Sequence, residues 1–306
     1  MPDLFNLQFV TVVGKGGVGK TTVSTALALA AARRGKRVLI AMCNAKERVS
    51  QLLEVPPIGA YNQTVLPGID AVNMNPKEAL EEYGMMVLKV RALYRAIFEN
   101  RLVAAFLRGT PGIEAWSMLG KAQFHARELT PDGRKRYDMV ILDSPATGHG
   151  LEMMRVPRVL LDVAPPGLLR REAERAWELF ADPTRAGALI VTLPEDMPVS
   201  ESIELNAALR DELGLPVAGL VVNGLLPRLF SAEEGDIVTS VARDIAPESP
   251  IHSLLVAGRR RTLRERVQAD ALARVQEELP LPRFELPLLV TAELARKELS
   301  QLADCF

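Results

Sequence analysis

One segment of the sequence has residue types and a spacing suited to holding phosphate. Residues 14–21 read G-K-G-G-V-G-K-T, which fits the phosphate-binding pattern G-x-x-x-x-G-K-[S/T]. The glycines let the loop bend so that successive backbone N–H groups point inward at phosphate oxygens. Lys20 is suited to the β- and γ-phosphates of ATP, and the Thr21 hydroxyl is suited to Mg²⁺. The sequence therefore predicts a Mg-ATP site at this loop.

The rest of the loop is expected to surround the nucleotide. An apolar run precedes the loop and a helical pattern follows it, so the positive end of a helix dipole is expected to face the phosphates. The Thr22 hydroxyl is placed to reach the α-phosphate region. The predicted nucleotide contacts are Gly16, Gly17, Val18, Gly19, Lys20, Thr21 and Thr22.

A second polar cluster follows an apolar run later in the chain. Residues 137–150 read Y-D-M-V-I-L-D-S-P-A-T-G-H-G. Four apolar residues that end in an acid place Asp143 at the carboxyl end of a buried strand, which faces the ligand crevice in a doubly wound sheet. Asp143 is therefore expected to hold Mg²⁺ through water. The loop after it is suited to a switch that responds to the γ-phosphate.

These two loops require a framework of alternating strands and helices. A helical pattern covers residues 21–34, with Gly35 as its C-cap. Such alternation predicts an α/β fold with a doubly wound, mostly parallel sheet of about seven strands. One P-loop ATPase domain is expected to cover residues 1–306. The predicted strands are residues 7–13, 38–42, 69–74, 137–142, 188–193, 217–222 and 284–289.

Two stretches break the strand–helix rhythm. Residues 76–130 show helical apolar spacing without a strand, which predicts a helical insertion. A second helix-rich stretch, residues 232–279, is expected to contribute to the same subdomain and contains the basic run G-R-R-R-T-L-R from Gly258. The helices expected in the insertion cover residues 79–94, 96–107 and 114–129.

Bulk composition excludes several classes of protein. A net charge of −1 over 306 residues offers no electrostatic basis for a nucleic-acid partner. Two cysteines, Cys43 and Cys305, provide neither a disulfide framework nor a zinc site. Charges interrupt every apolar run before about 18 residues, so no membrane span is expected. With no signal peptide predicted either, the expected compartment is the cytoplasm.

Both loops together resemble one family. The loop K-G-G-V-G-K-T-T resembles the deviant Walker A sequence, in which Lys15 is the additional lysine, and D-S-P-A-T-G-H-G-L from Asp143 resembles the switch of the ArsA-like ATPases. This family contains the arsenical pump-driving and tail-anchored-protein-targeting ATPases. The segment V-T-L-P-E followed by Glu201, and the segment V-V-N-G-L-L-P that contains Asn223, are also similar to it.

The resemblance implies a dimer that responds to nucleotide. Lys15 would reach across to the partner's nucleotide, and the partner would be a second copy or a paralogous subunit. Asn223 would read the adenine edge, since an amide offers both a donor and an acceptor. In the targeting ATPases the insertion forms a groove for a hydrophobic client. The residues suited to such a groove, or to a small helical core instead, are Met85, Met86, Leu88, Val90, Leu93, Tyr94, Ile97 and Phe98.

The sequence departs from the family after the second predicted strand. Asn44 stands where the family carries an aspartate that orients the attacking water. An amide cannot accept a proton as a carboxylate does. Hydrolysis is therefore expected to be slow, with Lys15, Lys20, Asn44 and Asp143 as the candidate catalytic residues. The zinc-binding C-x-x-C and the cysteine triad for arsenite are both absent.

Three functions fit these residues. The first is a slow ATPase that couples ATP binding and dimerisation to a protein client or a membrane partner. The second is the energising subunit of an anion transporter, although the ligands for arsenite are lacking. The third is a hydrolysis-deficient regulatory scaffold that pairs with an active paralogue.

Overall fold

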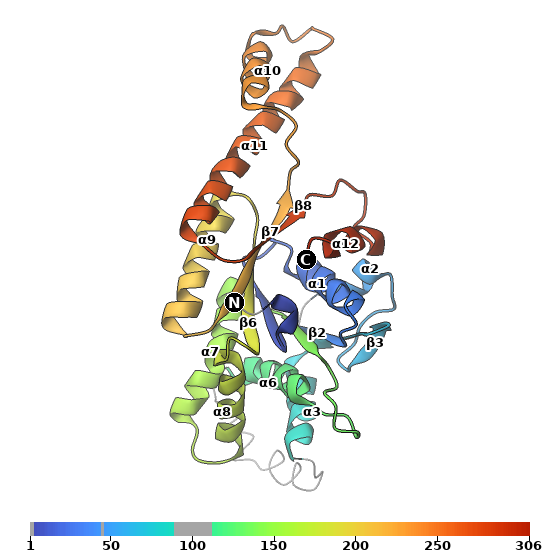
Figure 1. The fold of residues 1–306 in the computed structure, drawn as a ribbon, viewed down its shortest axis with the longest axis vertical. Helices are drawn as coiled ribbons and strands as arrows, with labels where there is room; N and C mark the ends of the chain where they lie inside the picture. Colours follow the sequence, from blue (N-terminus) through green and yellow to red (C-terminus); the bar gives the residue numbers. More distant parts are fainter. Residues whose placement is uncertain (1–2, 44–45, 89–111) are drawn as a thin grey trace.

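The computed structural model describes residues 3–43, 46–88 and 112–306, which form one eight-stranded sheet with helices on both faces (Figure 1). Every strand pairing is parallel except the pairing of β3 with β4. The predicted doubly wound α/β fold is confirmed. In spatial order the strands are β3 (Gln63–Leu66), β4 (Ile69–Met74), β2 (Val38–Cys43), β5 (Met139–Asp143), β1 (Phe9–Val13), β6 (Ala186–Thr192), β7 (Val217–Leu225) and β8 (Arg283–Pro287).

The predicted number of strands, about seven, omits β3. This strand has only four residues, is only partly buried, and pairs antiparallel with β4 at the edge of the sheet. Its sequence Q-T-V-L lacks the continuous apolar run of a strand that is buried on both faces. A turn with a positive φ at Gly68 joins β3 to β4, so this strand depends on its neighbour rather than on its own hydrophobicity.

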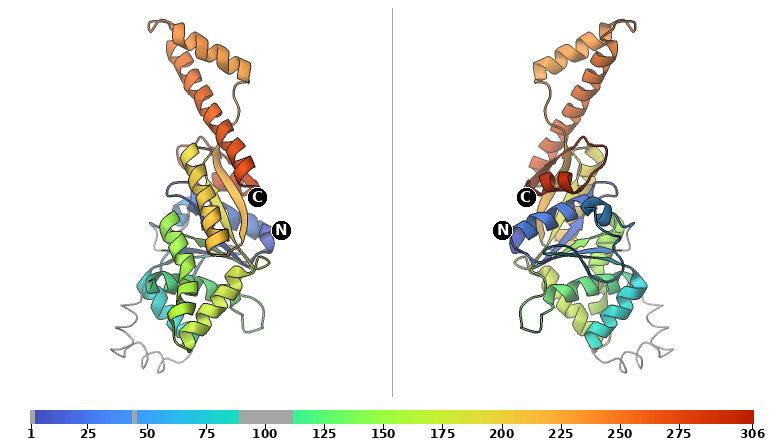
Figure 2. Two further views of the ribbon diagram at one scale, coloured as in Figure 1. Left: turned by 90° about the vertical axis from the view of Figure 1, so that its left-hand side faces the viewer. Right: turned by 90° about the vertical axis from the view of Figure 1, so that its right-hand side faces the viewer.

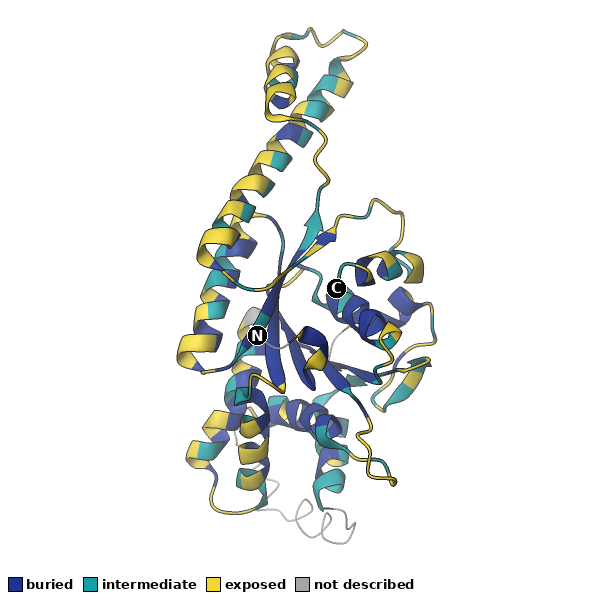
Figure 3. Cartoon of the chain, viewed as in Figure 1, coloured by how far each residue is buried: buried dark blue, intermediate teal, exposed yellow. Residues whose placement is uncertain are grey.

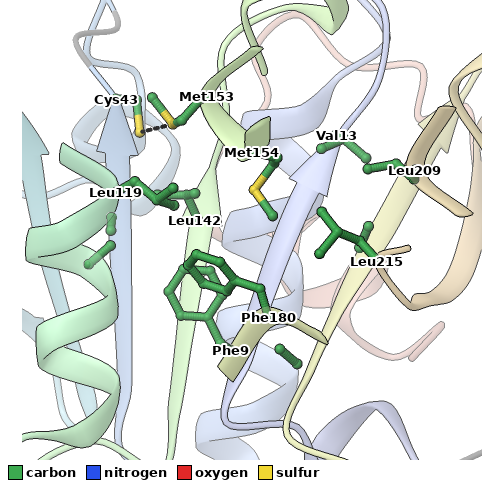
Figure 4. Close-up of a cluster of buried hydrophobic side chains, with 14 of the residues drawn as sticks. Phe9, Val13, Cys43, Leu119, Leu142, Met153, Met154, Phe180, Leu209 and Leu215 are labelled. Atoms are coloured by element: carbon green, nitrogen blue, oxygen red, sulfur yellow. Dashed lines mark hydrogen bonds between the residues drawn. The ribbon is translucent and has the colours of Figure 1, made fainter. Parts of the chain in front are cut away.

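Alternate side chains of β1 pack into two separate hydrophobic layers, one on each face of the sheet. Phe9 and Val13 pack into the layer shown in Figure 4, where Phe9 meets the ring of Phe180 at a centroid distance of 5.1 Å. Val10 and Val12 belong to the layer on the opposite face. Because successive side chains of a strand point to opposite faces, a strand covered on both sides reads as continuously apolar.

The helices divide between these two layers. One layer is covered by α1 (Lys20–Arg33), α2 (Val49–Leu53) and α12 (Arg296–Ala303). The other is covered by α6 (Ile113–Arg127), α7 (Thr147–Val163), α8 (Leu168–Ala181) and α9 (Asp196–Ala207), with a π-helical turn, η2 (Ala208–Glu212). A 3₁₀ turn, η1 (Leu4–Asn6), precedes β1.

Two helices of the predicted insertion are among the described residues, α3 (Pro76–Leu88) and α6. They approach closely at Gly120, where an added Cβ would lie 2.7 Å from the Tyr83 ring. Lys121, fully buried, donates to Glu82 at 2.6 Å and to the Ala60 carbonyl at 2.9 Å. The helix expected at residues 96–107 lies outside the described residues, as do Val90, Leu93, Tyr94, Ile97 and Phe98.

Helices α10 (Ala232–Asp244) and α11 (His252–Glu278) form a hairpin that projects from the body (Figures 1 and 2). The sequence assigned this stretch to the same subdomain as residues 76–130, but the structure places it at the opposite end of the molecule from α3 and α6 (Figure 1). The sheet is buried while the hairpin is largely exposed (Figure 3). In the described ranges, no helix has both the length and the hydropathy to cross a bilayer.

Candidate nucleotide-binding site

The loop between β1 and α1 has a backbone that only glycine can follow at two points. Gly14 has a φ of +149°, and an added Cβ would lie 2.3 Å from the Val191 carbonyl oxygen of β6. Gly19 has a φ of +94°, and its Cβ would lie 2.3 Å from Nδ2 of Asn223 in β7. Both positions therefore need glycine for the conformation and for the closeness of the neighbouring strands.

Lys20 curls back over this loop from the first residue of α1. Its Nζ donates to the carbonyl oxygens of Gly14 at 2.9 Å and Lys15 at 3.0 Å. Partial burial lowers the pKa of Lys20, and the negative charge of Asp143 opposes that shift. The ammonium thus lies across the loop whose N–H groups are predicted to face phosphate, as the sequence pattern requires.

The two residues predicted to hold Mg²⁺ meet directly. The Thr21 hydroxyl donates to Oδ2 of Asp143 at 2.6 Å, and the Ser24 hydroxyl donates to Oδ1 at 3.2 Å. Burial raises the pKa of Asp143, while both hydroxyls and Lys20 act in the opposite direction. Hydroxyl and carboxylate oxygens are the ligands that Mg²⁺ prefers, so this donor set fits the ion. Sequence reasoning missed Ser24, although its spacing of three residues from Thr21 puts both on one helix face.

Lys15 contacts helix α9 of its own chain. Its Nζ lies 2.6 Å from Oε1 of Glu201 and 2.8 Å from the sulfur of Met197, both on α9. About a third of each side chain in the ion pair is exposed, 31% for Lys15 and 33% for Glu201. The reach of Lys15 across a dimer stays a prediction, and it requires Lys15 to leave this partner.

Asn223 connects β7 to the loop. Its Nδ2 donates to the Val18 carbonyl at 2.8 Å, so the amide nitrogen is already engaged. Val18 is buried, and Thr22 occupies the first turn of α1. Gly16 faces the switch, since a Cβ added there would lie 3.6 Å from Cβ of Ala146. Contact of Asn223 with adenine stays a prediction.

The predicted switch begins at Asp143 and continues into α7. The hydroxyl of Ser144 donates to the Val12 carbonyl at 2.6 Å and ties the start of the switch to β1, a contact that sequence reasoning missed. His149 is exposed on the first turn of α7. Asn44, the residue expected to slow hydrolysis, lies outside the described residues. Its neighbour Cys43 is buried 3.9 Å from the Met153 sulfur, and burial raises the pKa of its thiol.

A cavity of about 1050 Å³ lies beside the switch. It receives side chains from α3, α6 and α7 and reaches the ends of β2 and β4. Both apolar and charged groups line it, among them Met118, Met153, Val156, Glu114, Arg155 and His149. Helix α7 therefore borders this cavity at the same end where the switch begins. Of the methionines expected to line a groove, Met85 and Met86 are half-buried on α3.

Comparison with known proteins gives one family. The model of the anion-transporting ATPase family matches residues 7–164, which include the glycine-rich loop and Asp143. The ATPase BagA of Mycobacterium tuberculosis is 26% identical over 303 residues, covering 93% of this chain and 88% of that protein. An arsenical pump-driving ATPase of Escherichia coli is 25% identical over 242 residues, 74% of this chain and 41% of the pump ATPase. The ATPase ASNA1 homolog of Entamoeba dispar is 24% identical over 263 residues, 72% of this chain and 77% of that protein.

Proposed function

The chain belongs to the anion-transporting ATPase family, and from that premise we propose that it is a nucleotide-switched Mg-ATP-binding protein with slow ATPase activity. The observation that carries this proposal is the convergence of Lys20, Thr21 and Asp143 at the carboxyl ends of β1 and β5. These residues supply a cation for the phosphates and two oxygen ligands for Mg²⁺. When bound, Mg²⁺ would neutralise charge between the β- and γ-phosphates.

The switch provides the route from nucleotide to client. Asp143 starts the segment that continues through Ser144 into α7, and α7 lines the large cavity. A segment that orders around a γ-phosphate and relaxes after hydrolysis can shift a packed helix between two arrangements. In this proposal the cavity side of α7 contacts a hydrophobic protein client or a membrane partner, and its position depends on the nucleotide.

Dimerisation is the second part of the proposal, and the partner is a second copy or a paralogous subunit. Lys15 supports it, because this second lysine of the phosphate loop pairs with Glu201 of its own chain and can reach another site once released from that pair. Asn44 supports slow turnover, since positioning of water and electrostatics supply nearly all of the catalysis of phosphoryl transfer. An arsenite-driven role has less support, because Cys43 is buried and Cys305 is the one other cysteine of the sequence.

Sedimentation tests the dimer directly. The chain is expected to be monomeric without nucleotide and dimeric with ADP and aluminium fluoride, which mimics the transferring phosphoryl group. Lys15→Ala is expected to abolish the shift, whereas Lys297→Ala, an exposed lysine on α12, should leave it intact. A chain that stays monomeric with nucleotide, both alone and mixed with a paralogous subunit, would contradict this part of the proposal.

A further inference from the structure

In the described body, the outer part of the α10–α11 hairpin is held by its own two helices and by the segment just before α10, where the Pro227 carbonyl accepts from Arg261. The second half of α11 packs on the domain through Ala271 and Val275, which are buried. The first half packs on α10, where Gly235 closely approaches Thr262 and Gly258 closely approaches Val238. The two helices therefore hold each other, and their tip reaches away from the sheet (Figures 1 and 2).

The α11 side of the tip is basic although the chain as a whole is not. Residues 252–264 contain four arginines and no acidic residue, whereas the net charge of the whole sequence is −1. The α10 side, residues 232–248, carries Arg243 against five acidic residues, Glu233, Glu234, Asp236, Asp244 and Glu248. Arg261 is paired with Glu265. No described residue forms an ion pair with the other four, Arg243, Arg259, Arg260 and Arg264. These cations are therefore available to an anionic partner.

Aliphatic side chains are exposed among these arginines. Ile251 and Leu254, at the turn between the helices, are 51% and 71% exposed, and Leu263 on α11 is 46% exposed. Val256, Arg260 and Arg264 line one shallow hollow of about 530 Å³ along α11, as their spacing of four residues requires. Apolar and cationic groups thus lie together along the outer half of α11.

We propose that this tip docks on a membrane surface that carries anionic lipids. Arginines pair with the phosphates of lipid headgroups, and exposed aliphatic side chains enter the boundary between headgroups and acyl chains. An acidic protein would also satisfy the charges, but it would need a pocket shaped for side chains spread around a turn and a helix. A deformable lipid surface adapts to the side chains along one face of α11, such as Val256, Arg260 and Arg264. The proposal depends on the hairpin alone and is independent of nucleotide binding.

Vesicle flotation with the full chain tests the charged part of the tip. The chain is expected to float with vesicles of phosphatidylcholine and phosphatidylglycerol and to dissociate from them as the salt concentration is raised. It should not bind vesicles of pure phosphatidylcholine. Each basic residue near an anionic surface is worth about fivefold in partitioning, so Arg259→Glu/Arg260→Glu/Arg264→Glu should lose about 100-fold or more. The matched control Arg171→Glu/Arg210→Glu/Arg296→Glu changes the same net charge at three exposed arginines outside the hairpin.

A second pair of variants tests insertion of the apolar side chains. Leu254→Ser is expected to weaken vesicle binding severalfold. Val290→Ser, which alters a 97% exposed residue outside the hairpin, should change nothing. Equal loss in the two triple variants, or no binding of the wild type to anionic vesicles, would overturn the proposal. So would capture by poly-glutamate without binding to vesicles, which would assign the tip to an acidic protein.

Discussion

The nucleotide edge of the sheet and the α3–α6 end of the molecule are held together by different means. At the nucleotide edge, contacts join side chains far apart in sequence, such as Thr21 with Asp143 and Asn223 with the Val18 carbonyl. At the α3–α6 end, helices are joined by Gly120 against the Tyr83 ring and by the buried Lys121. Substitutions at the first region should therefore change ligand binding more than folding, and substitutions at the second should do the reverse.

The largest effect is expected for Lys20→Ala at the nucleotide edge. Removing the ammonium that serves the β- and γ-phosphates should weaken Mg-ATP binding by a few kcal/mol, or on the order of 100-fold or more. The free energy of unfolding should change little, because among the described residues Lys20 donates to two loop carbonyls, those of Gly14 and Lys15. Calorimetry with Lys297→Ala as control measures the affinity. An unchanged dissociation constant would contradict the assignment of Lys20.

Lys121→Ala is the matching test at the other region. This substitution leaves the Glu82 carboxylate and the Ala60 carbonyl without their buried donor. Breaking a fully buried pair costs about 3–5 kcal/mol, and a cost of about 2–3 kcal/mol is expected because Glu82 remains 23% exposed. Urea unfolding measures the loss, and Lys121→Met should recover part of it by filling the space. If Lys121→Ala had normal stability but bound ATP weakly, the proposed difference between the two regions would be wrong.

The substitution Asn44→Asp tests whether hydrolysis at the nucleotide edge is slow because a carboxylate that orients water is missing. Loss of a group that orients water typically costs about 10²- to 10⁴-fold in rate. Restoring it should raise the steady-state ATPase rate by about tenfold or more, with the affinity for ATP nearly unchanged. Asn44→Ala is the control for a simple change of side chain. If the wild type already hydrolyses ATP rapidly and Asn44→Asp is no faster, another residue must orient the attacking water.

The two regions also differ in how far the sequence predicts them. Buried parallel strands such as Val38–Cys43 read as continuous apolar runs, and polar residues that follow such strands lie at one edge of the sheet. That logic placed Asp143 at the carboxyl end of a buried strand facing the ligand crevice, and in the structure Asp143 accepts a hydrogen bond from Thr21 there. No comparable rule predicted β3, a half-exposed edge strand, or the direction of the α10–α11 hairpin. These features depend on packing between distant segments, which apolar periodicity does not record.

The Lys15–Glu201 pair was likewise not predicted as a contact, because the position of α9 against the loop follows from the tertiary fold. The pair gives the smallest expected effect and the sharpest test of the nucleotide edge. An ion pair with both partners about a third exposed contributes up to about 1 kcal/mol. If Lys15 must leave Glu201 to reach a partner's nucleotide, that energy opposes dimerisation.

Glu201→Gln should therefore tighten the nucleotide-dependent dimer by up to about fivefold for each subunit that releases its pair, while lowering the stability of the monomer by at most about 1 kcal/mol. Glu204→Gln, an exposed residue on the same helix, controls for the loss of a charge. The gain should vanish when Lys15→Ala is combined with Glu201→Gln, because the two residues act through one contact. Sedimentation equilibrium measures all four proteins. A weaker dimer in Glu201→Gln would mean that Glu201 serves the assembled dimer, for instance by accepting from the partner, rather than restraining Lys15 in the monomer.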